Sequence, residues 1–200
     1  LCFLFISKDL YKNFNEIKKP YLIKADWSRK YLDIKKAYYW SDQSNFSEEI
    51  ALNHYKKFGN AKAEKSDFTK LKENFNYNLL ELIKESPNTN FVLFYPPYSI
   101  LEYKRMSKPY SNLEFKGKSK DDNWLKDVLK FKKYVFNKTK ELNNVTIFDF
   151  QTADRITHNL NNYKDLRHYS VNINNWIIEQ IMEKNYLVTS DNIDDNNQKL

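Results

Sequence analysis

The sequence predicts an α/β domain with a mainly parallel sheet flanked by helices. Segments with the apolar spacing of amphipathic helices alternate along the chain with short, unbroken apolar runs. Such runs are typical of strands covered on both faces, and their alternation with helices indicates a parallel sheet. The chain contains only 2 Gly and 5 Pro, which argues against a turn-rich all-β architecture. We expect one domain over residues 1–188 and a disordered polar tail over residues 189–200.

The N-terminal part contains one clear strand pattern, the apolar run of residues 1–6. A helix should follow this strand and end at Pro20, because proline has no backbone N–H for helical hydrogen bonding. Residues 21–59 mix aromatic and polar side chains without a clear period. We interpret them as irregular chain with short helices, forming a lid or a packing insert.

The first strong helix has apolar residues at spacings of three and four from Phe68 to Ile83. Ser66 is its candidate N-cap, and Pro87 lies just beyond its predicted end. The apolar run 91–95 then predicts a buried strand, which two consecutive prolines should end because neither can donate to a sheet ladder.

A second strong helix should open at Asp121 or Asp122 and end at the pair Asn143-Asn144. Residues 145–150 predict the next strand, and residues 170–184 predict the last helix. In a parallel sheet, ligands bind beyond the carboxyl ends of the strands. The segments that leave the strands 91–95 and 145–150 are therefore expected to meet at one site.

The charge of the chain favours solubility over recognition of an anionic polymer. It carries 33 Lys and Arg against 26 Asp and Glu, a formal net charge of +7, with both signs interleaved. A nucleic-acid-binding domain needs its basic residues gathered on one face, so this function is only a second alternative here. The single cysteine, Cys2, excludes an internal disulfide, and no His, Asp and Glu stand at the spacings of a metal site. We therefore expect no metal and no cofactor.

Asp165 and His168 form the most informative pair in the chain. A serine hydrolase needs an imidazole that accepts the serine proton and a carboxylate that orients the imidazole. A separation of three residues lets the carboxylate reach the ring within one turn of chain, just before the predicted last helix. We predict these two residues as the acid and the base of a catalytic site. His54 and His158 are interpreted as solvated surface residues.

Three further residues are candidates for substrate binding. Tyr95 and Tyr98 follow a predicted strand and could line a pocket; the alternative is a strand-ending turn, with Ser99 capping a short helix over residues 100–106. Arg167 stands next to the predicted base and could hold an anionic group of a substrate; the alternative is an ordinary solvated side chain.

Longer runs of the C-terminal half resemble the SGNH/GDSL hydrolase-like family found with bacterial cell-envelope polysaccharide genes. The resemblance rests on residues 147–151, 156–170 and 173–177, and on residues 91–99, which resemble the penultimate strand of that family and the loop that follows it. It implies a flavodoxin-like three-layer fold, with Asp165 as the orienting acid and His168 as the base. It also implies an acylated glycan or another small ester as substrate, and a membrane-anchored, extracytoplasmic envelope protein whose anchor is not in this chain.

The nucleophile is where the chain departs from the family pattern. Members carry a serine near the N-terminus in a Gly-Asp-Ser or Gly-x-Ser setting, whereas the only glycines here are Gly59 and Gly117, and neither precedes such a serine. Ser7, after the first strand, is one candidate. We favour instead that this chain is the C-terminal portion of a longer protein and is inactive alone. A non-catalytic module for envelope polysaccharide assembly is the first alternative.

Overall fold

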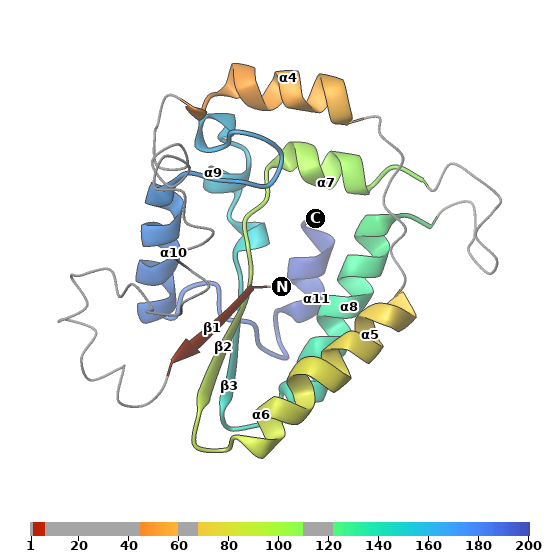
Figure 1. The fold of residues 1–200 in the computed structure, drawn as a ribbon, viewed down its shortest axis with the longest axis vertical. Coiled ribbons are helices and arrows are strands. Elements are labelled where there is room, and N and C mark those ends of the chain that lie inside the picture. The colour runs from red at the N-terminus through yellow and green to blue at the C-terminus, as the bar shows by residue number, and fades with distance from the viewer. Residues whose placement is uncertain (1, 7–44, 60–67, 110–121) are drawn as a thin grey trace, which may run out of the picture.

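A three-stranded sheet lies at the centre of the molecule and helices surround it (Figure 1). The computed structural model describes residues 2–6, 45–59, 68–109 and 122–200. The strands, in the order β1-β2-β3, are β1 (Cys2–Ile6), β2 (Asn90–Tyr95) and β3 (Val145–Asp149). β1 runs antiparallel to β2, and β2 runs parallel to β3. This mixture of helices and strands is compatible with the predicted α/β class, but the described sheet is mixed and not mainly parallel, because β1 runs antiparallel to β2.

Helices account for most of the remaining described chain. They are α4 (Glu48–Phe58), α5 (Phe68–Phe75), α6 (Glu81–Glu85), α7 (Ile100–Met106), α8 (Trp124–Thr139), α9 (Asp154–Thr157), α10 (Val171–Met182) and α11 (Ile193–Gln198). The predicted helix before Pro20 and the cap at Ser66 lie outside the described residues.

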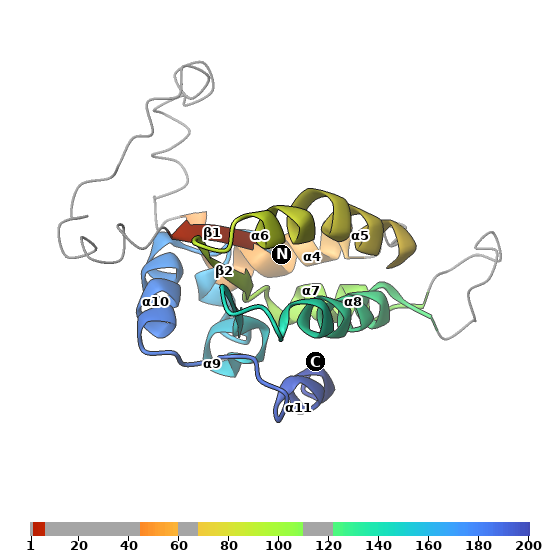
Figure 2. The same cartoon turned by 90° about the horizontal axis from the view of Figure 1, so that it is seen from below.

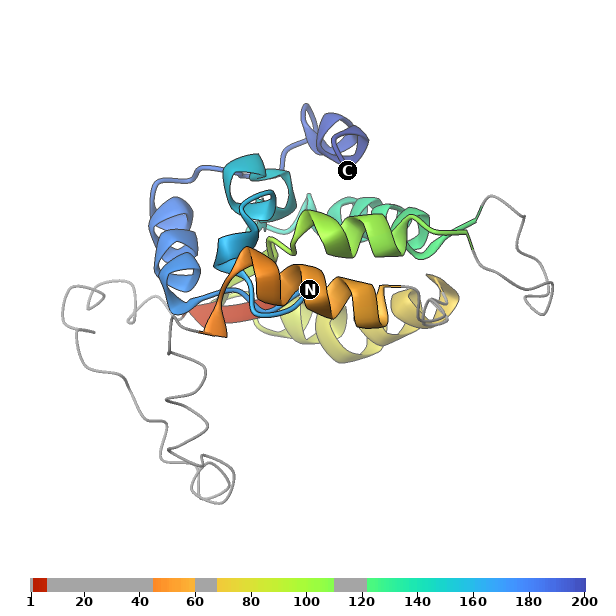
Figure 3. The ribbon, with the colours of Figure 1, turned by 90° about the horizontal axis from the view of Figure 1, so that it is seen from above.

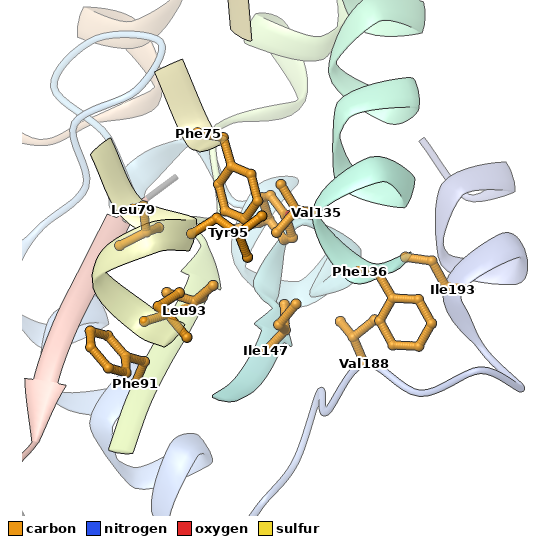
Figure 4. Close-up of a cluster of buried hydrophobic side chains, with 12 residues drawn as sticks. Phe75, Leu79, Phe91, Leu93, Tyr95, Val135, Phe136, Ile147, Val188 and Ile193 are labelled. Atoms are coloured by element: carbon orange, nitrogen blue, oxygen red, sulfur yellow. The ribbon is translucent and has the colours of Figure 1, made fainter. Parts of the chain in front are cut away.

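One face of the sheet is covered by α5, α6 and α8 (Figure 4). Alternate residues of β2, namely Phe91, Leu93 and Tyr95, are buried on this face with Ile147 of β3. α8 contributes Val135 and Phe136, and the continuous helical stretch from α5 to α6 contributes Phe75, Leu79, Leu80 and Ile83. The two-residue period of the strand thus separates its side chains between two cores.

The opposite face of the sheet is covered by α10, which lies across the sheet from α8 (Figures 1 and 2). Phe148 packs there with Ile173 and Ile177, and Val92 and Phe94 contact the same cluster. A strand with apolar side chains on both faces is what the unbroken apolar run of β2 predicted.

The helix predicted from Phe68 to Ile83 is continuous but not uniform. Between α5 and α6, the segment Asn76–Leu80 is π-helical. A π-turn inserts an extra residue and rotates the stripe of side chains that follows it. Leu79 and Leu80, the last two residues of this segment, are both buried in the core.

Asn144, one of the two residues predicted to end the helix α8, also holds the start of β2 in place. The Asn144 side-chain amide donates to the carbonyls of Ile83, Ser86 and Thr89 at 3.0–3.2 Å, and the Asn144 carbonyl accepts from Phe91 N at 2.7 Å. The loop after α6 and the loop after α8 are therefore joined by one side chain.

The tail does not follow the prediction of disorder. Residues 189–200 contain α11, and Ile193 is buried in the core with Val188, whose N–H donates to the Ile147 carbonyl at 2.8 Å. Leu200 packs beside the cluster around Tyr103. Ile193 and Leu200 thus attach residues 189–200 to the rest of the domain, although the polar composition of this segment predicted disorder.

Candidate active site

The loop after η4 (Leu160–Asn162) presents the predicted catalytic pair at its tip. Tyr163 and Tyr169 form an isolated antiparallel bridge, and Lys164 N donates to the His168 carbonyl at 3.1 Å. Tyr163 is fully buried, and its hydroxyl donates to the Pro97 carbonyl at 2.8 Å. The loop is thus closed at its base and attached to the segment that leaves β2.

Asp165 and His168 are joined by a hydrogen bond of 2.6 Å between Oδ2 and Nδ1. Because an ionised carboxylate only accepts, this contact requires the proton on Nδ1 and leaves Nε2 as the basic nitrogen of the neutral ring. The other carboxylate oxygen accepts the backbone N–H groups of Arg167 and His168, both at 2.8 Å. The His168 side chain is 56% exposed and that of Asp165 is 20% exposed.

The surroundings of Asp165 keep its side chain ionised. Burial acts to raise the pKa of the Asp165 carboxyl, but the hydrogen bonds from the two backbone N–H groups and from the His168 ring outweigh it, so that the pKa lies below its usual value. An ionised carboxylate on Nδ1 is the arrangement that orients a histidine base and stabilises its protonated form.

A second carboxylate, Glu102 of α7, organises two arginines beside the pair. Arg105 donates from Nε and Nη2 to the two oxygens of Glu102, both at 2.8 Å, and Arg167 Nε donates to Oε1 at 2.6 Å. Glu102 is completely buried. Burial acts to raise the pKa of the Glu102 carboxyl, but the bonds and charges of the two arginines lower it below its usual value.

Trp124, the first residue of α8, stacks with both guanidinium groups. The Cζ atoms of Arg105 and Arg167 lie 5.0 Å and 4.9 Å from the centre of its ring. Arg167 also lies 5.9 Å from the ring centre of Tyr98. At these distances a guanidinium is attracted to an aromatic face, so the aromatic side chains help to hold both arginines in place.

Ser99 couples the loop to α7. Its hydroxyl donates to the Leu166 carbonyl at 2.8 Å, and its backbone N–H donates to the same oxygen at 3.1 Å. Ser99 is the N-cap of α7, as the turn interpretation expected, but its side chain makes no capping hydrogen bond. The side chain instead holds the segment that carries Asp165 and His168 against the start of the helix.

A cavity of about 300 Å³ lies beside the pair. Its described lining residues come from α4, α7 and the loop: His54, Phe58, Glu102, Arg105, Asp165, Leu166, Arg167 and His168. α4 runs beside α7 (Figures 1 and 3), and Lys108 Nζ donates to the Gly59 carbonyl at 2.8 Å. Among these described lining residues, none carries a hydroxyl or a thiol.

The structure brings together four of the five predicted site residues. Asp165, His168 and Arg167 line the cavity, and Tyr98 contacts Arg167. Tyr95 lies apart, in the core under α5 and α8 (Figure 4). Its hydroxyl is buried without a hydrogen-bond partner among the described residues, and burial, with the charge of Asp149, raises the pKa of this hydroxyl far above its usual value.

The sequence did not indicate that His54, Glu102 and Arg105 would line the site. Glu102 and Arg105 are three residues apart on a short helix, a pattern so common that it predicts only a surface ion pair. His54 was interpreted as a surface residue; it lines the cavity from α4, and its Nδ1 is buried without a hydrogen-bond partner among the described residues. His158 is exposed and hydrogen-bonds to Thr157 and to the Asp154 carbonyl.

A separate ion pair lies at the carboxyl end of β3. Lys132 Nζ of α8 donates to Asp149 Oδ2 at 2.5 Å and to Gln151 Oε1 at 3.0 Å, and both charged side chains are completely buried. Burial lowers the pKa of the Lys132 ammonium, although the charge of Asp149 acts to raise it. No solvent-exposed surface is available to a substrate here.

The comparisons with family models, with curated proteins and with solved structures find no match to this chain. In the part of the chain that the structure describes, no three His, Cys, Asp or Glu side chains gather in a way that could hold a metal ion. The same ranges contain no helix with the length and apolar character needed to cross a bilayer.

Proposed function

We propose that this chain supplies the acid and the base of an SGNH-type serine esterase or acyltransferase that acts on acyl groups of an envelope glycan. The observation that carries the proposal is the 2.6 Å bond between Asp165 and His168 at the edge of a cavity. The presence of helices on both faces of the sheet is compatible with the three-layer fold that the resemblance implies.

The chemistry follows from the two side chains. His168 Nε2 accepts the proton of a serine hydroxyl as the serine oxygen attacks the ester carbonyl, and Asp165 stabilises the imidazolium that forms. The imidazolium then gives its proton to the leaving alkoxide, which leaves an acyl-serine. Water or an acceptor hydroxyl attacks this acyl group while His168 takes its proton, and the imidazolium then gives that proton to the departing serine oxygen, which restores the free serine.

The nucleophile in this proposal comes from outside the described residues. Ser7 is one candidate, and a serine outside these 200 residues is the other. The described lining of the cavity offers no competing hydroxyl or thiol. If no serine reacts, the alternative hypothesis of a non-catalytic module for envelope polysaccharide assembly remains.

A serine-reactive fluorophosphonate tests the proposal on the full natural chain. We expect one serine to be labelled, and we expect His168→Ala to slow labelling by about 10³-fold or more, because the hydroxyl loses its base. His158→Ala is the matched control, since His158 is exposed and does not line the cavity in the described chain; it should label at the wild-type rate.

Mass spectrometry of the labelled peptide identifies the nucleophile and decides between Ser7 and a serine outside these 200 residues. Absence of label in the natural protein would exclude a serine hydrolase and leave the non-catalytic module. Equal labelling of wild type and His168→Ala would equally contradict the assigned base.

A further inference from the structure

A second cavity, of about 400 Å³, lies at the amino end of β3. Its described lining comes from the C-terminal end of α8, the first residues of β3 and the segment 184–190 that follows α10. None of these residues also lines the cavity beside His168. The two cavities are therefore separate, and the properties of the second do not depend on the proposed function.

The ionisable side chains that line the second cavity in the described chain are both cations, Lys140 at the C-cap of α8 and Lys184. Neither ammonium group has a hydrogen-bond or ion-pair partner among the described residues. Glu141, Glu183 and Asp191 adjoin lining residues in sequence but do not themselves line the cavity. Two unpaired positive charges beside a partly enclosed space attract an anion.

Three hydroxyl groups add hydrogen-bond donors to the same lining. They belong to Thr146, Thr189 and Ser190, and none of them has a hydrogen-bond partner in the described part of the chain. The hydroxyl of Thr139 differs, because it donates to the Val135 carbonyl at 2.9 Å. Hydroxyl and ammonium groups can donate together to the oxygen atoms of one carboxylate or phosphate.

The turn that carries Lys184 is held in an unusual backbone conformation. Lys184 and Tyr186 have φ angles of 58° and 62°, in the left-handed region that residues with a Cβ rarely adopt. Lys184 N donates to the Ile181 carbonyl at 3.2 Å, and Asp149 N donates to the Tyr186 carbonyl at 2.9 Å. The backbone of Lys184 is thus joined both to the end of α10 and to β3.

Apolar side chains form the remaining part of the lining. Phe136, Ile147 and Val188 are buried members of the core that reach this cavity (Figure 4), and Val145 and Leu187 beside them are half-buried. Ligand pockets of this size generally combine an apolar surface with a few polar groups that fix orientation. Cations and hydroxyls beside an apolar surface suit a ligand that has both an anionic and an apolar part.

We propose that this cavity binds an amphipathic anion, a carboxylate or phosphate group joined to a short apolar chain. Lys140 and Lys184 bind the anionic group, and the chain covers the apolar side chains Phe136 and Val188. The alternative role of Lys140 is to offset the negative end of α8. Two carbonyls there, those of Phe136 and Thr139, already accept backbone N–H groups at 2.8 and 2.9 Å.

Titration followed by nuclear magnetic resonance tests the site on the full natural chain. The probes are hexanoate and hexyl phosphate, which have both parts, acetate, which has only the anion, and 1-hexanol, which has only the chain. Ionic strength is kept constant with chloride. We expect saturable shifts of the Ile147 and Val188 methyl signals with at least one two-part probe, and dissociation constants at least about 10-fold weaker for acetate and 1-hexanol.

The double variant Lys140→Gln/Lys184→Gln should weaken binding of the tighter two-part probe by about 10-fold or more, because both cations are lost. It should leave the affinity for 1-hexanol unchanged. Lys130→Gln is the matched control, since Lys130 is exposed on α8 and does not line the cavity in the described chain; its affinities should equal those of wild type.

Saturation by neither two-part probe, 1-hexanol binding as tightly as hexanoate, or equal affinities of the double variant and Lys130→Gln would each overturn the site. The last result would leave Lys140 with its role at the end of α8.

Sedimentation with phosphatidylcholine vesicles that contain or lack phosphatidylglycerol identifies the source of the anion. Sedimentation that requires phosphatidylglycerol and is lost in Lys140→Gln/Lys184→Gln, but not in Lys130→Gln, assigns the anion to a lipid surface. Binding of hexanoate or hexyl phosphate without such sedimentation assigns the site to a free amphiphile.

Discussion

Two acid–base pairs of this protein have similar hydrogen bonds but opposite exposure. Lys132 and Asp149 meet at 2.5 Å with both side chains fully buried, whereas Asp165 and His168 meet at 2.6 Å with the histidine more than half exposed. The buried pair joins α8 to the end of β3. The exposed pair lies at the edge of a cavity and is held by backbone N–H groups of its own loop.

The difference shows why geometry alone does not identify a reactive group. A buried pair is costly to break and has no route to a substrate, so it serves the fold. A pair at a cavity edge contributes little to stability, because solvent screens its charges, but a ligand in the cavity can reach it. Four experiments test this contrast.

The largest expected effect is on reactivity at the exposed pair. Asp165→Asn places an amide where the carboxylate accepts the Nδ1 proton, which favours the wrong histidine tautomer. We expect the rate of fluorophosphonate labelling to fall by about 10⁴-fold, equivalent to roughly 5 kcal/mol of activation free energy. Thermal unfolding should show a change of only a few degrees in Tm. A large loss of stability with an unchanged labelling rate would reverse the assignment of roles.

Lys132→Met should give the largest loss of stability. It leaves the Asp149 carboxylate buried without its cation, at a cost of about 3–5 kcal/mol in the free energy of unfolding, measured by urea denaturation. The double variant Lys132→Met/Asp149→Leu removes both charges and should recover most of this loss, because an apolar pair of similar volume needs no desolvation. If the double variant is as unstable as the single one, packing and not charge explains the effect.

Acid should expose a smaller contribution from Asp165. Its folded pKa lies below its usual value, so its stabilising effect is complete above the unfolded pKa of about 4 and is lost as pH falls through the lower folded pKa. Denaturation measured between about pH 6 and pH 2 should therefore show a weaker acid dependence in Asp165→Asn than in wild type. Identical profiles would mean that the three hydrogen bonds to Asp165 do not favour its charged form.

The smallest effect is expected at an exposed pair next to Lys132. Lys133 contacts Asp194 of α11 at 2.7 Å, but the two side chains are 51% and 64% exposed. Lys133→Met should change the free energy of unfolding by less than about 1 kcal/mol, because solvent screens the pair. Lys132 and Lys133 are thus a matched comparison of the same substitution at neighbouring positions, and similar losses would show that burial does not set the cost.

Features that depend on neighbouring residues were predictable from the sequence. The strand β2 and the helix α8 follow from apolar runs or periodicity and from the proline and asparagine residues that end them, and the short helix α7 was expected as the alternative to a pocket-lining segment. The contact between Asp165 and His168 is also local, because three residues separate the partners and the loop's own N–H groups orient the carboxylate.

Features that depend on distant residues needed the tertiary structure. Glu102 meets Arg167 across 65 residues of sequence, through a loop that Ser99 holds at Leu166. The same packing brings His54 to the cavity and places Tyr95 in the core, against the expectation that Tyr95 would line a pocket. No spacing rule carries this information, because side chains of the same type are buried or exposed according to what packs on them.

The sequence alone predicts an acid and a histidine three residues apart, followed directly by a helix, in an α/β chain. Only the packing of α4 and α7 against the loop places this pair beside a cavity with two arginines and a buried glutamate. The physical reason is range: hydrogen bonds within a loop are set by spacing along the chain, whereas burial and net charge in a cavity are set by which helices pack around it.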